Sequence, residues 1–379
     1  MEKKLYEEIL SNVISYPTVN PPGNEKELAE YLDGVLKDLG FKSYVQDVSP
    51  GRANVIAEFG PEDAEESIML SGHLDVVGVE DNWSTDPFEL TIKDNRYYGR
   101  GTCDMKGQVV AMIIAAKRLM DEKVPLKRKV MLGFVADEEI GTTGTQVMVN
   151  SGVKPTYCVI GEPTEMDIDI AHRGVNHYGV TFTGRAGHAS SPQSALNPIY
   201  PAAMFVLEIE KLQEELQKKE HYILPSPTVT ADIIRGGVQW NAVPESCMVE
   251  VDRRTIPEED KEYVYNEYLN IIEKVKAQYP EIKYEHTYIS GIPSSEPQED
   301  FILKDICKEV LEEMGVETRI RDFPAGTDQY VHLQAGIDCV LVGPGSISKQ
   351  AHITDEYLDI PDAELGIEFY YNLIAKMAK

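Results

Sequence analysis

The pattern of apolar and polar positions divides the chain into segments with helical spacing and short runs that are apolar throughout. Apolar residues recur at the spacing of a helix ahead of Gly40, at Leu28, Tyr31, Leu32, Val35, Leu36 and Leu39, and a glycine commonly follows the last turn of a helix. Residues 68–70, 130–135 and 157–160 are apolar runs of the length of buried strands. This alternation up to Ile160 predicts an α/β fold with a mostly parallel sheet flanked by helices.

The pattern changes near His177. From there the sequence predicts a strand at 178–182, a long helix at 196–219, strands at 229–234 and 247–253, and a helix that ends near 279. A length of 379 residues allows two domains. We therefore expect a smaller α/β lid over residues 177–290, inserted into a catalytic domain made of residues 1–176 and 291–379.

Candidate chemistry begins where the first apolar run ends, in the segment Ser71-Gly72-His73-Leu74-Asp75. Side chains two positions apart on a strand share a face, so His73 and Asp75 can touch. A metal-bound imidazole usually donates its other ring N–H to a carboxylate, which fixes the orientation of the ring. The spacing predicts that His73 binds a metal and that Asp75 orients it.

Further acidic residues lie in turns or just after the predicted strands that come later in the chain. Asp104 lies in the glycine-rich turn Gly99–Gly107 before an apolar helix that runs from Gln108 toward Met120, and the pair Glu138 and Glu139 and then Glu162 each follow an apolar run. The ends of strands in open α/β sheets are where ligands bind. Three carboxylates converging there, Asp104, Glu139 and Glu162, would repel one another without a cation.

Two divalent cations remove that repulsion. Their charge of about +4 against about −3 from the three carboxylates leaves about one positive charge to favour a hydroxide at neutral pH. Glu138 is then a spare carboxylate, free to take a proton from water and pass it to a leaving group.

Together these motifs resemble the di-zinc aminoacylase/carboxypeptidase family, which includes acetylornithine deacetylase and succinyl-diaminopimelate desuccinylase. The resemblance covers essentially the whole chain. It is carried by Ser71–Asp75, Gly99–Gly107, Asp137–Glu139, Gly161–Thr164, Gly184–His188, Asn241 with Asp252 and Arg254, and Gly343–Gly345 ahead of Ala351–His352.

The resemblance implies a site with two Zn²⁺ ions, for which Co²⁺ or Mn²⁺ can substitute. Asp104 would bridge the two metals, His73 and Glu162 would complete one site, and Glu139 and His352 the other. Glu138 would be the general acid and base, and His188 would stabilise the oxyanion, in its own subunit or from the partner of a homodimer formed through the lid. Arg254 and Asn241 would hold the substrate carboxylate, with Gly345 also at the substrate.

Simpler interpretations remain open for several of these residues. His188 could belong to an ordinary loop, and of the neighbours Arg253 and Arg254 only one can face the site, because side chains alternate along a strand. His172 could lie behind the metal ligands, whereas His177, His221, His286 and His332 carry no supporting motif. Cys103 adjoins Asp104, but the oxygen and nitrogen ligands suffice without it.

The composition limits the kinds of binding partner and the cellular compartment that we expect for the protein. The formal charge is −28, from 36 basic and 64 acidic residues, and the chain has no basic run to follow a phosphate backbone, so a nucleic-acid partner is not expected. Five cysteines without a Cys-x-x-Cys pair predict buried, reduced thiols. The longest apolar stretch, 109–116, is far short of a membrane span, and the amino-terminal residues lack the apolar core of a signal peptide. We expect a soluble, cytoplasmic protein without membrane partners.

The predicted reaction is hydrolysis of the amide bond of an N-acyl amino acid. N-acetylornithine, cleaved to ornithine and acetate, is the leading substrate, and the alternatives are succinyl-diaminopimelate or a dipeptide, as for a dipeptidase or carboxypeptidase. Gly326-Thr327-Asp328 departs from the acetylornithine deacetylase pattern, which leaves side-chain recognition open. A metal-dependent phosphoesterase is disfavoured because no further Lys/Arg cluster accompanies the motifs, and a non-catalytic binding protein is disfavoured because every motif residue is present.

Overall fold

The computed structural model describes residues 2–297 and 301–377 and divides the chain into two compact units. The first unit comprises Met1–Ile170, Pro297–Phe323 and Thr327–Lys379, and the second comprises Ala171–Glu296 with Pro324–Gly326. The sequence placed the inserted domain at 177–290, whereas the second unit begins at Ala171, ends at Glu296 and takes in one further short segment of the chain.

The first unit is built on an eight-stranded sheet with the order β1-β2-β6-β3-β7-β16-β8-β15. Its strands are β1 (Lys42–Ser49), β2 (Arg52–Phe59), β3 (Ser67–His73), β6 (Lys129–Val135), β7 (Tyr157–Ile160), β8 (Ile168–His172), β15 (Ile320–Phe323) and β16 (Asp338–Leu341). The central strands β6, β3, β7 and β16 are parallel. Toward the edges, β1 with β2, β2 with β6 and β16 with β8 pair antiparallel, so the sheet is mixed.

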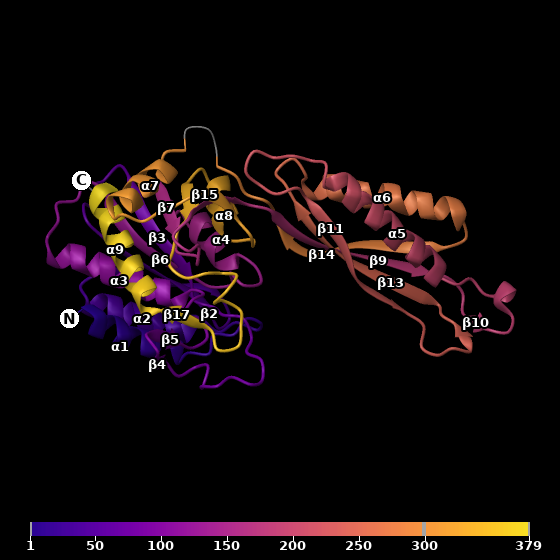
Figure 1. Cartoon of the computed structure of the whole chain (residues 1–379), viewed down its shortest axis with the longest axis horizontal. Coiled ribbons are helices and arrows are strands. Elements are labelled where there is room, and N and C mark those ends of the chain that lie inside the picture. The colour runs from indigo at the N-terminus through magenta and orange to yellow at the C-terminus, as the bar shows by residue number, and fades with distance from the viewer. Residues whose placement is uncertain (1, 298–300, 378–379) are drawn as a thin grey trace. The chain divides into compact units, whose positions relative to one another are not determined.

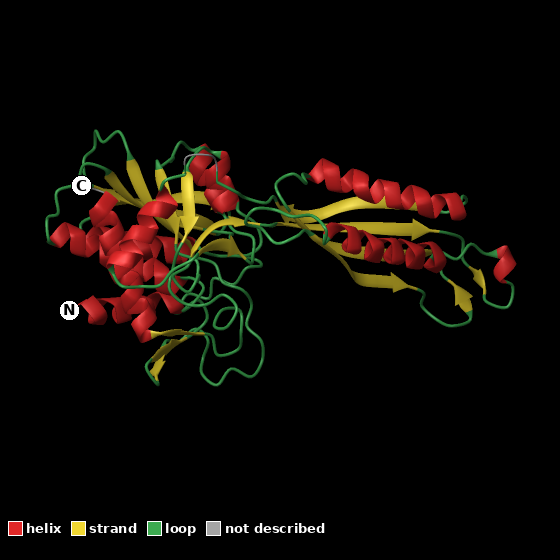
Figure 2. Ribbon diagram, turned by 45° about the horizontal axis from the view of Figure 1, so that its top comes forward, coloured by secondary structure: helices red, strands yellow, loops and turns green. Residues whose placement is uncertain are grey.

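Helices flank this sheet (Figures 1 and 2). They are α1 (Glu2–Ile14), α2 (Lys26–Asp38), α3 (Lys106–Asp121), α4 (Thr143–Asn150), α7 (Leu303–Glu313), α8 (Gln329–Gln334) and α9 (Ile360–Met377). The apolar helix α3 is buried along nearly its whole length and packs against α9, α1 and β3. This burial fixes the turn from which α3 starts, since the helix has little room to shift.

A separate three-stranded sheet, with the order β17-β5-β4, lies beside the glycine-rich turn. Its strands are β4 (Thr91–Lys93), β5 (Arg96–Tyr98) and β17 (Tyr357–Asp359), and Tyr357 is paired with Tyr98. The pairing brings the carboxyl-terminal part of the chain next to the segment that leads into Gly99.

The second unit is a four-stranded antiparallel sheet, ordered β11-β13-β9-β14, with two long helices side by side on it (Figure 1). Its elements are β9 (Gly174–Thr183), β11 (Thr228–Gly236), β13 (Ser246–Thr255), β14 (Lys283–Ile292), α5 (Ile199–Leu216) and α6 (Lys261–Gln278), with the short β10 (Gly187–His188), β12 (Ala242–Val243) and η1 (Pro192–Ser194). Strands β9 and β13 alternate between buried and half-buried positions, and their buried side chains form a core with α5 and α6. This is the pattern of a sheet with one covered face.

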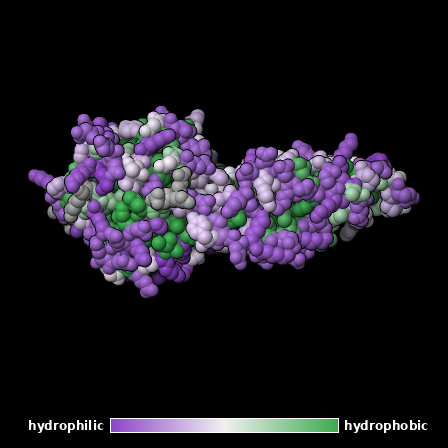
Figure 3. All heavy atoms as spheres, turned by 90° about the horizontal axis from the view of Figure 1, so that it is seen from above, coloured by the Kyte–Doolittle hydropathy of each residue, from purple (hydrophilic) through white to green (hydrophobic). Residues whose placement is uncertain are grey.

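Polar residues dominate the face of the molecule in Figure 3, in keeping with a formal charge of −28. Across residues 2–297 and 301–377, none of the helices combines the length and the hydropathy that crossing a bilayer requires.

Candidate metal centre

His73 stands at the end of β3, with Asp104 and Glu162 beside it. Its side chain is 1% exposed, its Nε2 lies 2.9 Å from Asp104 Oδ1 and 3.8 Å from Glu162 Oε1, and its Nδ1 lies 2.9 Å from the main-chain oxygen of Asp75. A carbonyl oxygen can only accept, so Nδ1 carries a proton and donates it there. In the neutral ring, Nε2 then presents its lone pair toward the two carboxylates, as a metal ligand would.

The second group of predicted ligands meets at the other oxygen of Asp104. His352 Nε2 lies 3.2 Å from Asp104 Oδ2 and 3.1 Å from Glu139 Oε2. Asp104 therefore touches a histidine with each carboxylate oxygen, which is the arrangement expected of a bridging ligand. The structure brings together all five residues that the sequence proposed as ligands.

Two sets of side chains in the described part of the chain could each hold an ion, with their ligand atoms within 4.8 Å of one another. One set is His73, Glu138 and Glu162, and the other is His73, Asp104 and Glu139. Glu138 thus lies among the candidate ligands rather than apart from them.

Burial and neighbouring charges shift the pKa values of the acidic side chains in this cluster. Burial and the charge of Glu162 raise the pKa of Glu138 well above its usual range, and burial together with the charge of Asp104 does the same to Glu162 and, less strongly, to Glu139. For Asp104, burial opposes ionisation, but hydrogen bonds from His352 and His73 outweigh it and lower the pKa. Three carboxylates whose pKa values rise together favour a bound cation.

The histidines show the complementary effect. Hydrogen bonds to Asp104 and Glu139 raise the pKa of His352 to about 10. Burial opposes the charged form of His73, yet the hydrogen bond to Asp104 and the surrounding carboxylates raise its pKa well above normal. A metal ion bound at either ring would have to displace such a proton, since His must be neutral to act as a ligand.

These side chains fit a pair of divalent metal ions. Glu162 Oε1 is buried and has no hydrogen-bond partner among the described residues, an expensive state for a carboxylate oxygen that a cation would relieve. The ligands are imidazole nitrogens and carboxylate oxygens, which suit zinc, cobalt or manganese. Cys103, adjoining Asp104, is buried and its thiol lies 3.9 Å from the carbonyl oxygen of Ser346.

Asp75 differs from the sequence-based interpretation. Its carboxylate lies 3.7 Å from His73 Nδ1, too far for a good hydrogen bond, and the ring is held by the main-chain oxygen of Asp75 instead. The carboxylate accepts the main-chain N–H groups of Glu138 and Glu139, both at 3.1 Å. The reason for the difference is that β3 ends at His73, so Asp75 no longer follows strand alternation.

A buried network behind Asp75 was not predicted from the sequence. Asn20 donates from Nδ2 to Asp75 Oδ2 at 2.8 Å and to Asp137 Oδ1 at 3.0 Å. Arg52 Nη1 donates to Asp137 Oδ1 at 2.8 Å. Asp137 itself has a φ of 72°, in the left-handed region that only a few residue types enter readily. The network holds the turn that carries Glu138 and Glu139.

Two more buried acids bear on the centre. The carboxylate of Glu356 accepts three main-chain N–H groups of the glycine-rich turn and the Arg100 side chain. Burial raises the pKa of Asp328 to about 7 against a hydrogen bond from Thr145, and the charge of Asp328 adds to the rise at Glu138. Asp328 belongs to the Gly326-Thr327-Asp328 segment that departs from the deacetylase pattern. Nothing in the sequence distinguished Glu356.

In the second unit, His188 and Asn241 are neighbours. His188 pairs with Ala242 across β10 and β12, and the main-chain oxygen of Asn241 accepts from Ala189 N at 3.0 Å. His188 is exposed, and its Nδ1 accepts the Ser190 main-chain N–H at 3.2 Å. A neutral His188 therefore carries its proton on Nε2, where it can serve as a donor.

Arg254 lies in a different sheet, near the far end of β13, the strand that follows β12 in the chain. It follows Ser246, the first residue of β13, by eight positions, which corresponds to roughly 25 Å of strand. Its guanidinium already forms a two-pronged contact with Asp252, at 2.8 and 3.1 Å, and Asp252 also contacts His177. Arg253 points the other way and is fully buried, so Arg254 is the half-exposed member of the pair. Within one chain Arg254 and Asn241 are not brought together.

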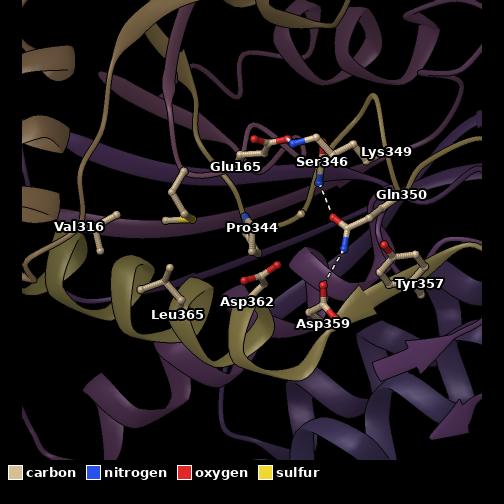
Figure 4. A pocket seen from close by; sticks show the side chains of 12 residues that line it. Glu165, Val316, Pro344, Ser346, Lys349, Gln350, Tyr357, Asp359, Asp362 and Leu365 are labelled. Atoms are coloured by element: carbon tan, nitrogen blue, oxygen red, sulfur yellow. Dashed lines mark hydrogen bonds and ion pairs between the residues drawn. The ribbon is translucent and has the colours of Figure 1, made fainter. Parts of the chain in front are cut away.

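Gly345 lines a cavity of about 350 Å³ in the first unit (Figure 4). None of the five candidate ligands lines it; its wall includes Glu165, Asp359 and Asp362 instead. Gly345 has a φ of 87°, and a Cβ there would lie 2.7 Å from the Cys103 thiol, so glycine is required by close packing behind Asp104.

Among the remaining histidines, His332 is buried with its Nε2 3.7 Å from the Cys158 thiol. His172 is buried in the second unit, and its Nδ1 contacts the main-chain oxygen of Arg173 at 3.0 Å. The five cysteines are free and buried, as the sequence predicted for thiols.

Comparison with known proteins agrees with this geometry. The chain is 34% identical over 356 residues to an acetylornithine deacetylase of Vibrio campbellii, covering 89% of this chain and 87% of that protein. It is 28% identical over 382 residues to a probable succinyl-diaminopimelate desuccinylase of Staphylococcus aureus, covering 93% and 92%. Among solved structures, a tripeptidase of Staphylococcus aureus has a TM-score of 0.84 at 18% identity and is covered over 98% of its length, with 99% of this chain.

Residues 69–376 match the family described as Peptidase family M20/M25/M40. This confirms the resemblance on which the expected fold and enzyme class rest. The chain belongs to the M20/M25/M40 family and is a hydrolytic enzyme.

Proposed function

We propose that the protein hydrolyses the amide bond of an N-acyl amino acid, with N-acetylornithine as the first candidate. The observation that carries the proposal is the position of Glu138. Its carboxylate lies within 4.8 Å of ligand atoms of His73 and Glu162, and its side chain makes no hydrogen bond to the residues that the structure describes. Its main-chain N–H is held by Asp75. A carboxylate with a raised pKa, on an anchored main chain and among candidate metal ligands, is suited to take up and release a proton.

His73, Asp104, Glu139, Glu162 and His352 would hold two divalent cations, zinc or in its place cobalt or manganese. When bound, such ions polarise the scissile carbonyl and make a nearby water more acidic. Glu138 accepts the proton that this water loses as its oxygen attacks the carbonyl carbon. It then gives that proton to the nitrogen of the leaving amine, so the carboxylate is regenerated at the end of the cycle.

We further propose that His188 donates from Nε2 to the oxyanion, and that it does so in the partner subunit of a homodimer. The tautomer supports the donor role, because Nδ1 is already an acceptor. The separation of His188 and Asn241 from Arg254 along the second unit supports the contribution of two chains to one site. Exposed apolar side chains on α5, Tyr200 and Leu207, and Ile234 on the edge strand β11 offer a surface for the dimer.

The substrate proposal follows the relatives. The deacetylase is the more similar of the two relatives above, at 34% against 28% for the desuccinylase. An ornithine-forming reaction would serve arginine biosynthesis. Succinyl-diaminopimelate and dipeptides stay as second candidates, because Asp328 belongs to the motif that departs from the deacetylase pattern. Free, buried cysteines agree with action in the cytoplasm.

The decisive experiment measures amine release from N-acetylornithine, N-succinyl-diaminopimelate and a panel of dipeptides. The enzyme is first stripped of metal and then refilled with zinc, cobalt or manganese. We expect turnover of one N-acyl amino acid that disappears on stripping and returns with metal. Cleavage of dipeptides alone would replace the deacylase by a peptidase, and turnover unaffected by metal removal would contradict the metal mechanism.

A further inference from the structure

Glu356 gathers several donors around one buried carboxylate. Its side chain is fully buried, and Oε1 accepts the main-chain N–H groups of Gly101 at 3.0 Å, Cys103 at 2.9 Å and Asp104 at 3.1 Å. Oε2 accepts Arg100 Nη1 at 2.7 Å. Three of the peptide groups leading to Asp104 are therefore pinned to a single oxygen atom.

Arg100 extends this cluster toward His73. Its side chain is 1% exposed, and Nη2 donates to the main-chain oxygen of Gly78 at 3.0 Å. Gly78 lies in the segment that leaves β3 after His73 and Asp75. The Glu356–Arg100 pair thus connects the glycine-rich turn to the segment that follows the first histidine ligand.

The main chain around Glu356 links His352, the last candidate ligand in the sequence, to the glycine-rich turn. Glu356 is four positions after His352, and its main-chain oxygen accepts Gly99 N at 3.1 Å. The next residue, Tyr357, begins β17 and is paired with Tyr98 on β5. The hydrogen bond between the Glu356 carboxylate and Asp104 therefore joins residues more than 250 positions apart in the sequence.

We propose that Glu356 is a positioning residue that fixes Asp104 relative to His352 and so sets the affinity and geometry of the metal centre. This inference rests on the proposed function, because it concerns the same centre. The physical reason is that Asp104 would have to serve two ions at once, and a turn rich in glycine cannot hold such a side chain by itself. Partners behind the ligands of a metal site commonly change metal affinity by about 10- to 100-fold.

Glu356→Gln is the sharpest substitution, because it keeps the size of the side chain. The amide can present its oxygen to the three N–H groups, but its NH₂ then faces the Arg100 guanidinium, donor against donor. Turned around, the NH₂ faces the three main-chain donors. Either orientation leaves buried donors without an acceptor, and the turn must move to relieve them.

The measurement is metal binding without substrate. Metal-free protein is titrated with Co²⁺ and with Zn²⁺ in competition with a chromophoric chelator, and the visible absorption spectrum of the cobalt form is recorded. Circular dichroism and thermal unfolding of the metal-free protein check the fold. The matched control is Glu364→Gln on α9, an exposed carboxylate paired with Lys3, which we expect to match the unaltered protein in every readout.

We expect Glu356→Gln to keep its circular dichroism, to bind at least one Co²⁺ about 10- to 100-fold more weakly and to show an altered cobalt spectrum. Should this variant fail to fold, Glu356→Gln combined with Arg100→Met removes both buried charges while leaving the amide oxygen for the three N–H groups. In that case the paired variant is expected to fold and to bind metal more weakly than the unaltered protein, because the tie to Gly78 is lost.

Two cobalt ions bound with unchanged affinity and spectrum in a folded Glu356→Gln or paired variant would overturn the inference while leaving the proposed function in place. If the unaltered protein itself bound no metal, both would fall. If it bound two ions but cleaved no N-acyl amino acid, the proposed reaction would fail and the positioning role would still be decided by the cobalt titration.

Discussion

At the scale of single residues, Glu138 and His352 should separate proton transfer from metal binding. Glu138→Gln keeps the size of the side chain but cannot accept a proton, so we expect a loss in kcat of about 10²–10⁴-fold with two metals still bound. His352→Ala removes the nitrogen that lies 3.1 Å from Glu139 and should lower metal content. Metal analysis and steady-state kinetics on both variants test this contrast.

Several outcomes would contradict these two assignments. Full activity in Glu138→Gln would remove the proton-transfer role, and a strong loss of metal in that variant would mean that Glu138 is itself a ligand, as its proximity to His73 and Glu162 allows. Two tightly bound metals in His352→Ala would exclude His352 from the ligand set.

The sequence predicts the residues of the centre better than their supporting contacts. His73 and Glu162 lie in motifs at the ends of strands, and Asp104 lies in the glycine-rich turn before α3, so residue type and local motif identify them. The role of the Asp75 side chain was predicted wrongly, because its direction depends on where β3 ends. Glu356 carries no local signal, since its four partners are reached only after the chain has folded.

At the scale of elements, two glycines in helical surroundings predict opposite effects of alanine. Gly34 lies exposed within α2 with nothing within 4 Å of an added Cβ, so Gly34→Ala should stabilise the fold by about 0.5–1 kcal/mol through helix propensity. Gly144 in α4 would place a Cβ 2.2 Å from the Ala136 oxygen, and Gly144→Ala should cost about 1–3 kcal/mol. Urea denaturation of the metal-free protein measures both, and equal effects would contradict this packing.

The sheet of the second unit contains a histidine whose titration should weaken the fold in acid. Burial lowers the pKa of His286 on β14 to about 4, and its ring stacks on Tyr265 at 4.2 Å. An unfolded histidine titrates near 6.5. Between these values the unfolded chain binds more protons, so this contribution to the unfolding free energy is complete above pH 6.5 and decreases as the pH falls toward 4.

His286→Phe tests that contribution, because phenylalanine keeps the stacked ring but cannot titrate. After allowance for partial exposure, we expect the unaltered protein to lose about 1–2 kcal/mol more than the variant between pH 7 and pH 4.5. Denaturation series at fixed pH values supply the measurement. Parallel pH profiles for the two proteins would show that His286 remains protonatable in the folded state.

Elements in the middle of the sheet could be predicted and its edges could not. The apolar runs at 130–135 and 157–160 correspond to β6 and β7, because strands buried on both faces need apolar side chains throughout. The direction of β2 beside β6 and of β8 beside β16 depends on pairing between distant segments, about which a local pattern says nothing. The mixed sheet follows from those pairings.

At the scale of the whole molecule, the insertion of one unit into the other was predictable because the pattern itself changes near His177. The boundaries of the inserted unit were harder to predict from the sequence. The boundary near residue 171 falls within β8, two residues before its end, and Pro324–Gly326 join the second unit through contacts such as that of Gly326 with Ile292. Such a return of three residues leaves no trace in periodicity.

The proposed dimer makes a quantitative prediction about mixed subunits. Glu138 and His188 belong to different units of the chain, and if His188 serves the partner's centre, a dimer of one Glu138→Gln chain and one His188→Ala chain has one complete site. Random exchange of equal amounts gives half mixed dimers with one working site of two, or about a quarter of the unaltered activity in a symmetric dimer. The mixture should therefore far exceed the mean of the two inactive proteins.

The matched control is a mixture of the Glu138→Gln protein with the His352→Ala protein, and both changes lie in the first unit. Every centre in that mixture lacks one of its own chain's residues, so no activity should return, although the subunits exchange equally well. Light scattering before and after exchange establishes the dimer. A monomeric mass with full activity would refute the dimer and the role of His188 across it together, whereas a stable dimer without recovery in the first mixture would place His188 in the site of its own chain.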